Sequence, residues 1–179
     1  MVKKKVFGPA VTAPSEAERA DVLLALLKAH PELVAEAERL AEAMLEGQDR
    51  EEVAASVARQ LRLLHIRDLA DRAGPQWGGG YVDPVEAVYE MAAEVVQPYL
   101  DDLTRRVKIG TIAAALEIGL GLLSGLYGCR QEDDNDLALV HGGLPDVVDD
   151  LADRVLTVMR KTDLAIPEDW MADECPAWS

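Results

Sequence analysis

Side chains that could bind a metal ion gather in one short acidic run. Its carboxylates are Glu132, Asp133, Asp134 and Asp136, and His141 follows. An EF-hand calcium loop needs oxygen ligands at its first, third and fifth positions and glycine at its sixth. Counted from Asp134, the fifth and sixth positions are alanine and leucine, so the spacing does not fit that loop. Because the paired Glu-x-x-His motifs of di-iron bundles are also missing from the chain, we interpret the run as a solvated acidic loop and predict no metal site.

Residues that could support covalent catalysis are present, but none of them has a catalytic spacing. Ser124 lies in an apolar glycine-rich segment and lacks the Gly-x-Ser-x-Gly pattern of hydrolase turns. His65 and Asp68 are about one helical turn apart, and we interpret them as a surface pair. The sequence therefore predicts no catalytic residue. A site that forms only in three dimensions around His65, Glu117 or Cys129 is an open alternative, which a deep pocket with perturbed ionisation would support.

Two glycine clusters invite comparison with phosphate-binding loops, in which glycines connect a strand to a helix. Gly119-Leu120-Gly121 follows no predicted strand, and the glycines at 78–80 lack the lysine of a nucleotide-binding loop. Neither cluster predicts a phosphate site, and the sequence predicts no cofactor.

The clearest loop, residues 74–83, carries two aromatic side chains. Trp77 and Tyr81 flank three consecutive glycines, and Trp170 and Trp178 lie in the C-terminal tail. Exposed aromatic residues are favoured anchors at protein interfaces, whereas buried ones pack as lids over a core. Both roles stay open for Trp77 and Tyr81, and we expect the packing role for the two tail tryptophans.

The charge of the chain is strongly negative and unevenly distributed. The 179 residues hold 18 basic and 33 acidic side chains, and residues 132–179 alone hold 3 basic and 13 acidic ones. A field of this sign repels a nucleic-acid backbone and suits either a basic partner or a solvated surface. We therefore predict no direct nucleic-acid binding. The candidate partner-binding residues are Trp77, Tyr81, Asp133, Asp134 and Asp136.

The N-terminal residues do not predict a secretory signal. The lysines at 3–5 precede a segment, 8–14, that is interrupted by glycine and proline, so no continuous apolar stretch follows them. Cys129 and Cys175 form no CxxC pair and predict no disulfide framework. We expect a cytoplasmic protein.

Composition and apolar periodicity predict an all-α fold. Leucine, alanine, glutamate and arginine favour helices, and the residues that mark strands are scarce. Capping patterns predict helix starts at Ser15, Asp49 and Asp83. Apolar residues then recur at helical spacing in three successive helices: Leu23, Leu24, Leu26 and Leu27; Leu33, Ala37, Leu40 and Met44; and Val53, Val57, Leu61 and Leu64. The short connections near residues 30 and 48 predict that these three helices pack as antiparallel neighbours.

Further helices are expected over residues 66–73, from Pro84 through Leu103, and over 145–161. Pro98 should kink or divide the second of these, because proline lacks an N–H group and clashes one turn back. The most apolar stretch, residues 109–129, predicts a buried central helix, since Glu117 near its middle opposes a membrane span. Small residues at 121, 125 and 128 would let a neighbouring backbone approach closely.

Three stretches resemble segments of a group of uncharacterised bacterial all-helical proteins. They are Gly-Tyr-Val-Asp-Pro-Val-Glu-Ala at 80–87, Gln-Pro-Tyr-Leu-Asp-Asp-Leu at 97–103 and Gly-Leu-Leu-Ser-Gly-Leu-Tyr at 121–127, within roughly residues 55–130. The resemblance implies helices and a bacterial source. It carries no activity, so no functional residue is assigned from it.

The sequence therefore predicts six to seven helices in a bundle or short helical-hairpin array around a buried glycine-rich helix. The expected organisation is an extended arm at 1–14, one helical domain at 15–161 and an acidic tail at 162–179. We hypothesise a non-enzymatic protein–protein interaction module, such as a scaffold, adaptor or regulator. The alternatives are an acidic inhibitor or antitoxin-like factor that covers a basic nucleic-acid-binding surface of a partner, and an enzyme or cofactor binder whose site the sequence does not reveal. Homo-oligomerisation through a leftover apolar face is a further option, and no membrane association is expected.

Overall fold

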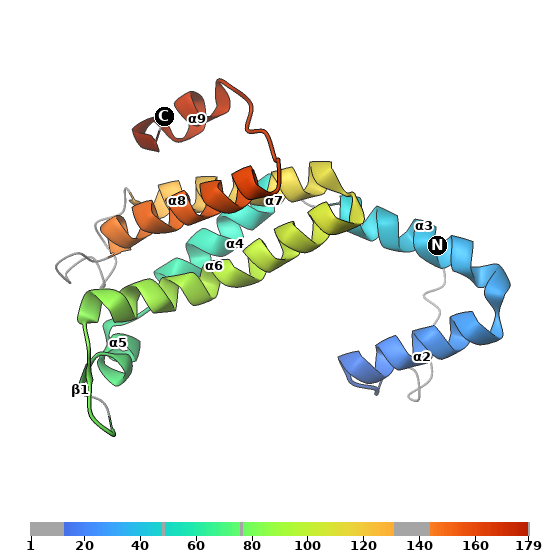
Figure 1. Ribbon diagram of the computed structural model, residues 1–179, viewed down its shortest axis with the longest axis horizontal. Coiled ribbons are helices and arrows are strands. Elements are labelled where there is room, and N and C mark those ends of the chain that lie inside the picture. The colour runs from blue at the N-terminus through green and yellow to red at the C-terminus, as the bar shows by residue number, and fades with distance from the viewer. Residues whose placement is uncertain (1–12, 48, 76, 131–143, 179) are drawn as a thin grey trace, which may run out of the picture. The chain divides into compact units, whose positions relative to one another are not determined.

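The computed structural model describes residues 13–47, 49–75, 77–130 and 144–178, and this part of the chain is almost wholly helical, as the sequence predicts (Figure 1). The elements are α2 (Glu16–Ala29), η1 (Pro31–Leu33), α3 (Val34–Glu46), α4 (Arg50–Arg62), α5 (Ile66–Arg72), β1 (Gly74–Pro75), β2 (Tyr81–Val82), α6 (Pro84–Ile109), α7 (Ile112–Arg130), α8 (Leu144–Lys161), α9 (Trp170–Glu174) and η3 (Pro176–Trp178). They form two compact units, one ending at Met44 and one beginning at Leu45.

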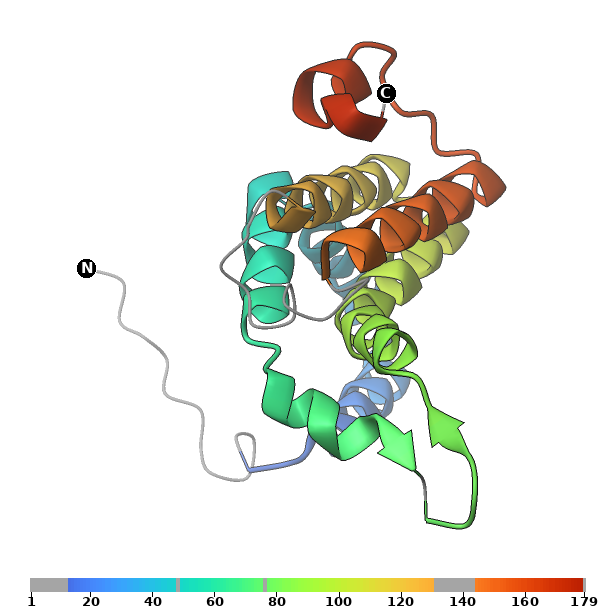
Figure 2. The same ribbon diagram turned by 90° about the vertical axis from the view of Figure 1, so that its left-hand side faces the viewer.

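The second unit is a helical bundle built around α7, which packs against α4, α6 and α8 (Figure 2). Eleven of the nineteen residues of α7 are buried, so the predicted glycine-rich central helix is confirmed. Its start differs from the prediction, because Gly110, at φ +88°, ends α6 in the left-handed conformation that favours glycine. Ile109 therefore belongs to α6, and α7 begins at Ile112.

Two glycines of α7 let the backbone of α4 come close. A Cβ atom at Gly121 would lie 2.7 Å from the carbonyl oxygen of Arg50, and one at Gly125 would lie 2.8 Å from that of Ala54. The expectation of close approach at residues 121 and 125 is thus confirmed. The same expectation for Gly128 is wrong, because a Cβ atom there would meet nothing within 4 Å.

By length and composition α7 is also apolar enough to cross a membrane, a property that central helices of bundles share. In the bundle most of its apolar side chains are covered by neighbouring helices, and the carboxylate of Glu117 is paired with the guanidinium of Arg50.

The first unit differs from the prediction. Its helices do form where the sequence indicates, and α2 begins with a capping box in which Ser15 and Glu18 bond each other's backbone N–H groups. However, neither α2 nor α3 has a buried residue. Helices α2 and α3 do not pack along each other either, so the expectation that they are antiparallel neighbours is wrong for this pair.

Pro98 does not divide α6, which runs as one helix of 26 residues. Both Pro98 and Glu94, whose carbonyl would have accepted the missing hydrogen bond, lie on the exposed face of the helix. Water can satisfy that carbonyl, which explains why the helix continues. Asp83 begins α6 as predicted by accepting a hydrogen bond from the Val85 N–H at 2.8 Å.

The C-terminal tail packs on the bundle. Cys175 and Leu164 are buried, and Trp178 donates an indole N–H to Asp149 Oδ1 at 2.9 Å. The Trp178 ring meets Tyr127 edge to face with centroids 5.1 Å apart, and the Trp170 ring lies 5.8 Å from Arg50 Cζ, as in a cation–π contact. The packing role expected for the tail tryptophans is confirmed.

Candidate functional site

The loop expected at residues 74–83 contains a small β-hairpin. Gly74 pairs with Val82 and Pro75 with Tyr81 in an antiparallel register. The three glycines between them, 78–80, have φ values of +118°, +91° and +118°, which a residue with a Cβ atom rarely adopts. This explains why three glycines are needed to turn the chain at the tip.

The base of the hairpin is fixed to the bundle. Leu69 of α5 is buried, and Val82 packs against the core. Arg72 of α5 donates two hydrogen bonds to the carboxylate of Glu94 on α6, at 2.6 and 2.8 Å, and the hydrogen bond from Arg72 lowers the pKa of Glu94. Both side chains are well exposed, so this pair adds orientation more than stability.

The hairpin carries the two aromatic residues that the sequence singles out, Trp77 near its tip and Tyr81 in β2. Trp77 is fully exposed, with a relative accessibility of 105%, and Tyr81 is 67% exposed. Neither ring covers the core, so the lid role is wrong for both. Three further apolar side chains are exposed at this end of the bundle, where α4 ends and α5 and α6 begin. We call Leu63, Ile66, Trp77, Tyr81 and Val85 together the hairpin surface.

Sequence reasoning missed Leu63 and Ile66 as part of this surface. Leu63 directly follows α4, and Ile66 is the first residue of α5. At the end of a helix, the spacing of apolar residues alone does not show whether a side chain faces the core or the solvent. The remaining candidate residues, Asp133, Asp134 and Asp136, lie outside the described residues.

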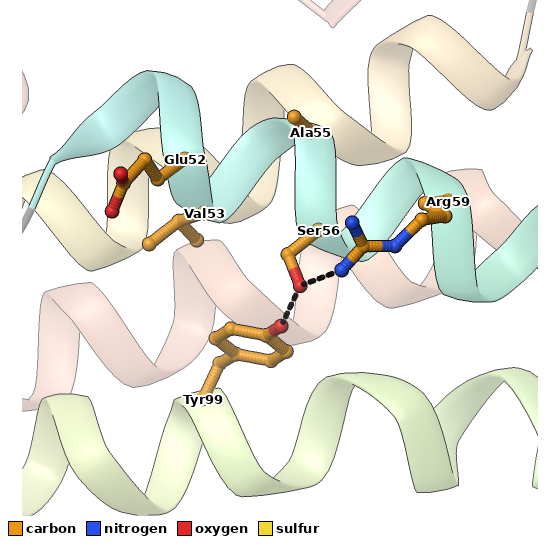
Figure 3. Close-up of a pocket in the computed structure, with 6 residues that line it drawn as sticks. All are labelled: Glu52, Val53, Ala55, Ser56, Arg59 and Tyr99. Carbon is orange, nitrogen blue, oxygen red and sulfur yellow. Dashed lines mark hydrogen bonds between the residues drawn. The ribbon is translucent and has the colours of Figure 1, made fainter.

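A second feature is a pocket of about 480 Å³ between α4 and α6 (Figure 3), and the six residues that line it are Glu52, Val53, Ala55, Ser56, Arg59 and Tyr99. The Tyr99 hydroxyl donates to Ser56 Oγ at 3.0 Å and accepts from Gln60 Nε2 at 2.9 Å. Arg59 also points its guanidinium at Ser56 Oγ, at 3.4 Å (Figure 3). The two bonds of Tyr99 tie α6 to α4. The residues that line the pocket include no histidine or cysteine that could act as a base or a nucleophile.

The residues proposed for a site formed in three dimensions are not brought together. Glu117 accepts two hydrogen bonds from Arg50, both at 2.9 Å, and this pairing raises the pKa of Arg50. Cys129 is buried and points its thiol at the carbonyl oxygen of Ala58 at 3.8 Å. His65 begins α5, where its backbone N–H donates to Asp68 at 3.3 Å. Each residue thus has a structural role in a different part of the bundle.

The second cysteine of the chain, Cys175, is also placed where it cannot readily act as a nucleophile. Burial, with a smaller contribution from the neighbouring Glu174 carboxylate, raises the pKa of Cys175 to about 11, which opposes formation of a reactive thiolate. Within the described ranges, no group of three or more His, Cys, Asp or Glu side chains is placed to hold a metal ion.

Comparison of the chain with protein-family models, with curated proteins and with solved structures gives no match.

Proposed function

We propose that the chain is a non-enzymatic protein–protein interaction module that engages its partner through the hairpin surface. The observation that carries this proposal is the complete exposure of Trp77 at the tip of a hairpin whose base is anchored. Tryptophan buries roughly 150–250 Å² when it packs, and it is among the residues most enriched at the energetic centres of interfaces.

The anchoring of the hairpin favours binding because it lowers the entropy that is lost when a partner engages. Glycines 78–80 turn the chain sharply, while the β1–β2 pairing and the Asp83 cap hold the two ends of the hairpin. Trp77 and Tyr81 therefore protrude from a defined platform. A shallow apolar pocket on the partner would complement them.

A photo-crosslinking experiment tests this proposal. A photoreactive phenylalanine analogue replaces Tyr81 in the full chain, which is expressed in the native cell and irradiated. We expect a discrete product with another protein, and we expect Trp77→Ala in the same chain to reduce it about tenfold or more, as for an interface anchor. The matched control places the analogue at Lys161, an exposed position at the end of α8. An identical product from both positions, or no product at 81, contradicts the proposal.

The second candidate function, an acidic factor that covers a basic surface, is favoured by one feature of α8. Asp146, Asp150 and Asp153 are exposed and follow one another at spacings of four and three residues, so they form a single acidic row. Binding through that row weakens steeply as salt rises, because screening acts on exposed charges. Binding through Trp77 depends less on salt. Crosslinking yields at low and at high NaCl therefore separate the two functions.

A further inference from the structure

The pocket between α4 and α6 has opposite charges at its two ends (Figure 3). Glu52 lies at one end and Arg59 at the other, and Ser56 and the ring of Tyr99 lie between them. The three residues from α4 follow one another at spacings of four and three, so they form a single row along the helix. The volume of about 480 Å³ is within the range of sites for small molecules.

The two charges have no oppositely charged partner in the described part of the chain. Glu52 and Arg59 are seven residues apart, which is too far for a pair along one helix, because such pairs form at spacings of three or four. Carboxylates are not scarce, since the chain holds 33 acidic and 18 basic side chains. Other arginines do pair with carboxylates, namely Arg39, Arg50, Arg72, Arg105, Arg106 and Arg130. The guanidinium of Arg59 is therefore available to an anionic group of a ligand.

The Arg59 end of the pocket is rich in hydrogen-bond donors and poor in acceptors. Ser56 Oγ accepts from the Tyr99 hydroxyl at 3.0 Å, and both Arg59 Nη2 and Gln60 Nε2 lie at 3.4 Å from the same atom. One oxygen thus serves three donors, two of them at distances longer than an ordinary hydrogen bond. A carboxylate only accepts hydrogen bonds, so it would satisfy the guanidinium and the hydroxyl proton of Ser56 together.

The Glu52 end requires a group of the opposite charge. The Glu52 carboxylate would attract an ammonium group, whereas it would repel a simple anion, as would the net charge of −15. A ligand that carries both charges avoids this repulsion. Arg59 turns its guanidinium back toward Ser56, four residues from Glu52, so the two charges are separated by roughly 6–10 Å along α4. An extended chain about as long as a lysine side chain spans that separation.

We propose that the pocket binds an ω-amino carboxylate, a molecule in which an aliphatic chain separates a carboxylate from an ammonium group. The ligand carboxylate pairs with the Arg59 guanidinium and accepts from the Ser56 hydroxyl. The ammonium group pairs with Glu52, and the aliphatic chain packs on the ring of Tyr99. A free amino acid of this kind and the C-terminal lysine of a peptide share this chemistry.

An NMR titration of the full isotope-labelled chain with 6-aminohexanoate tests the proposal. For a ligand of this size we expect a dissociation constant on the order of 1 mM, with backbone amide shifts confined to α4 and α6 around the pocket. Hexanoate and hexylamine keep one charge each and should bind at least about tenfold more weakly, because each loses a charge-assisted hydrogen bond. Nα-acetyl-lysine carries the two charges of a C-terminal lysine. If it binds more tightly than 6-aminohexanoate, the ligand is a chain end, and if it binds more weakly, the ligand is a free small molecule.

Two substitutions each remove one end of the site. Arg59→Gln and Glu52→Gln should each weaken the binding of 6-aminohexanoate about tenfold. Both residues are exposed, so the substitutions should leave the thermal unfolding of the bundle unchanged. The matched controls are Arg67→Gln and Glu51→Gln, which change the net charge by the same amounts at exposed positions that do not line this pocket. They should leave the dissociation constant unchanged.

Four outcomes overturn the proposal. They are the absence of a saturable shift with 6-aminohexanoate, shifts centred on another part of the chain, equal affinity for the probes with one charge, and equal effects of the pocket and control substitutions. The hairpin surface takes no part in these measurements, so their outcome is independent of the proposed function.

Discussion

The close approach of α4 to α7 predicts opposite effects for the same substitution at two glycines only three residues apart. Gly125→Ala places a methyl group 2.8 Å from the carbonyl oxygen of Ala54, a backbone atom that can move only if α4 moves. Gly128→Ala places the same group in open space. Because both changes give the same gain in helix propensity, their difference isolates the packing of the two helices.

The expected magnitudes follow from two opposing contributions. Replacing glycine by alanine within a helix stabilises it by about 0.8–1.0 kcal/mol, and forcing a methyl group into a packed contact costs about 1–3 kcal/mol. Gly128→Ala should therefore stabilise the chain by up to about 1 kcal/mol. Gly125→Ala should destabilise it by up to about 2 kcal/mol, because the packing cost exceeds the gain in propensity.

Thermal unfolding followed by circular dichroism measures the difference. The two variants differ by the packing cost of about 1–3 kcal/mol. For a chain of this size each kcal/mol corresponds to roughly 2–4 °C, so they should melt roughly 2–12 °C apart. Gly121→Ala should behave like Gly125→Ala, because its methyl group would meet the Arg50 carbonyl. Gly119→Ala should cost less, since it meets the flexible end of Met159. A Gly125→Ala chain at least as stable as the wild type would refute the reasoning.

Burial raises the pKa of Asp102, but hydrogen bonds from two arginines outweigh it, so the folded-state pKa lies below the ordinary value of 3.8. Asp102 therefore stabilises the fold above that pH, and this contribution is lost as the pH falls through the lowered pKa. Asp102→Asn should lower the free energy of unfolding by about 1–3 kcal/mol at neutral pH and progressively less in acid. A loss of stability that is the same at every pH contradicts the prediction. Trp178→Phe removes the indole N–H that bonds Asp149 and should lower the free energy of unfolding by about 0.5–1.5 kcal/mol, measured by urea titration; an unchanged free energy contradicts this. Cys175 is buried and its pKa is raised, so iodoacetamide should label it slowly in the folded chain and rapidly in denaturant; equal rates measured by mass spectrometry would mean that the tail does not stay packed.

The helix starts were predictable because capping is a local interaction. Ser15 with Glu18, and Asp83 ahead of Pro84, indicate the first turns of α2 and α6 without knowledge of the fold. The central position of α7 was predictable for a different reason, since a helix with several glycines and few polar residues is stable only when it is packed. Close approach at residues 121 and 125 followed from their spacing of one turn, but their spacing does not reveal that Gly128 is exposed and has no neighbour within 4 Å of a Cβ atom.

The environment of α2 and α3 was not predictable from periodicity. The spacing of Leu33, Leu40 and Met44 shows that one side of α3 is apolar, but it does not show whether the cover comes from the same chain. Pro98 was misjudged because the cost of a helical proline depends on whether water reaches the freed carbonyl. The exposure of Trp77 depends on how the hairpin leaves the bundle, which involves contacts of residues far apart in the sequence.

The unequal burial of the three tryptophans gives the chain a natural optical probe. Trp77 is open to solvent, whereas Trp170 and Trp178 are partly shielded against the bundle. A neutral quencher such as acrylamide, which the negative charge of the chain does not repel, should therefore dim the red-shifted emission of Trp77 first. Binding of a partner to the hairpin surface would then be visible in unlabelled protein as a blue shift of the Trp77 emission and a loss of its quenching. The emission of Trp170 and Trp178 should stay unchanged.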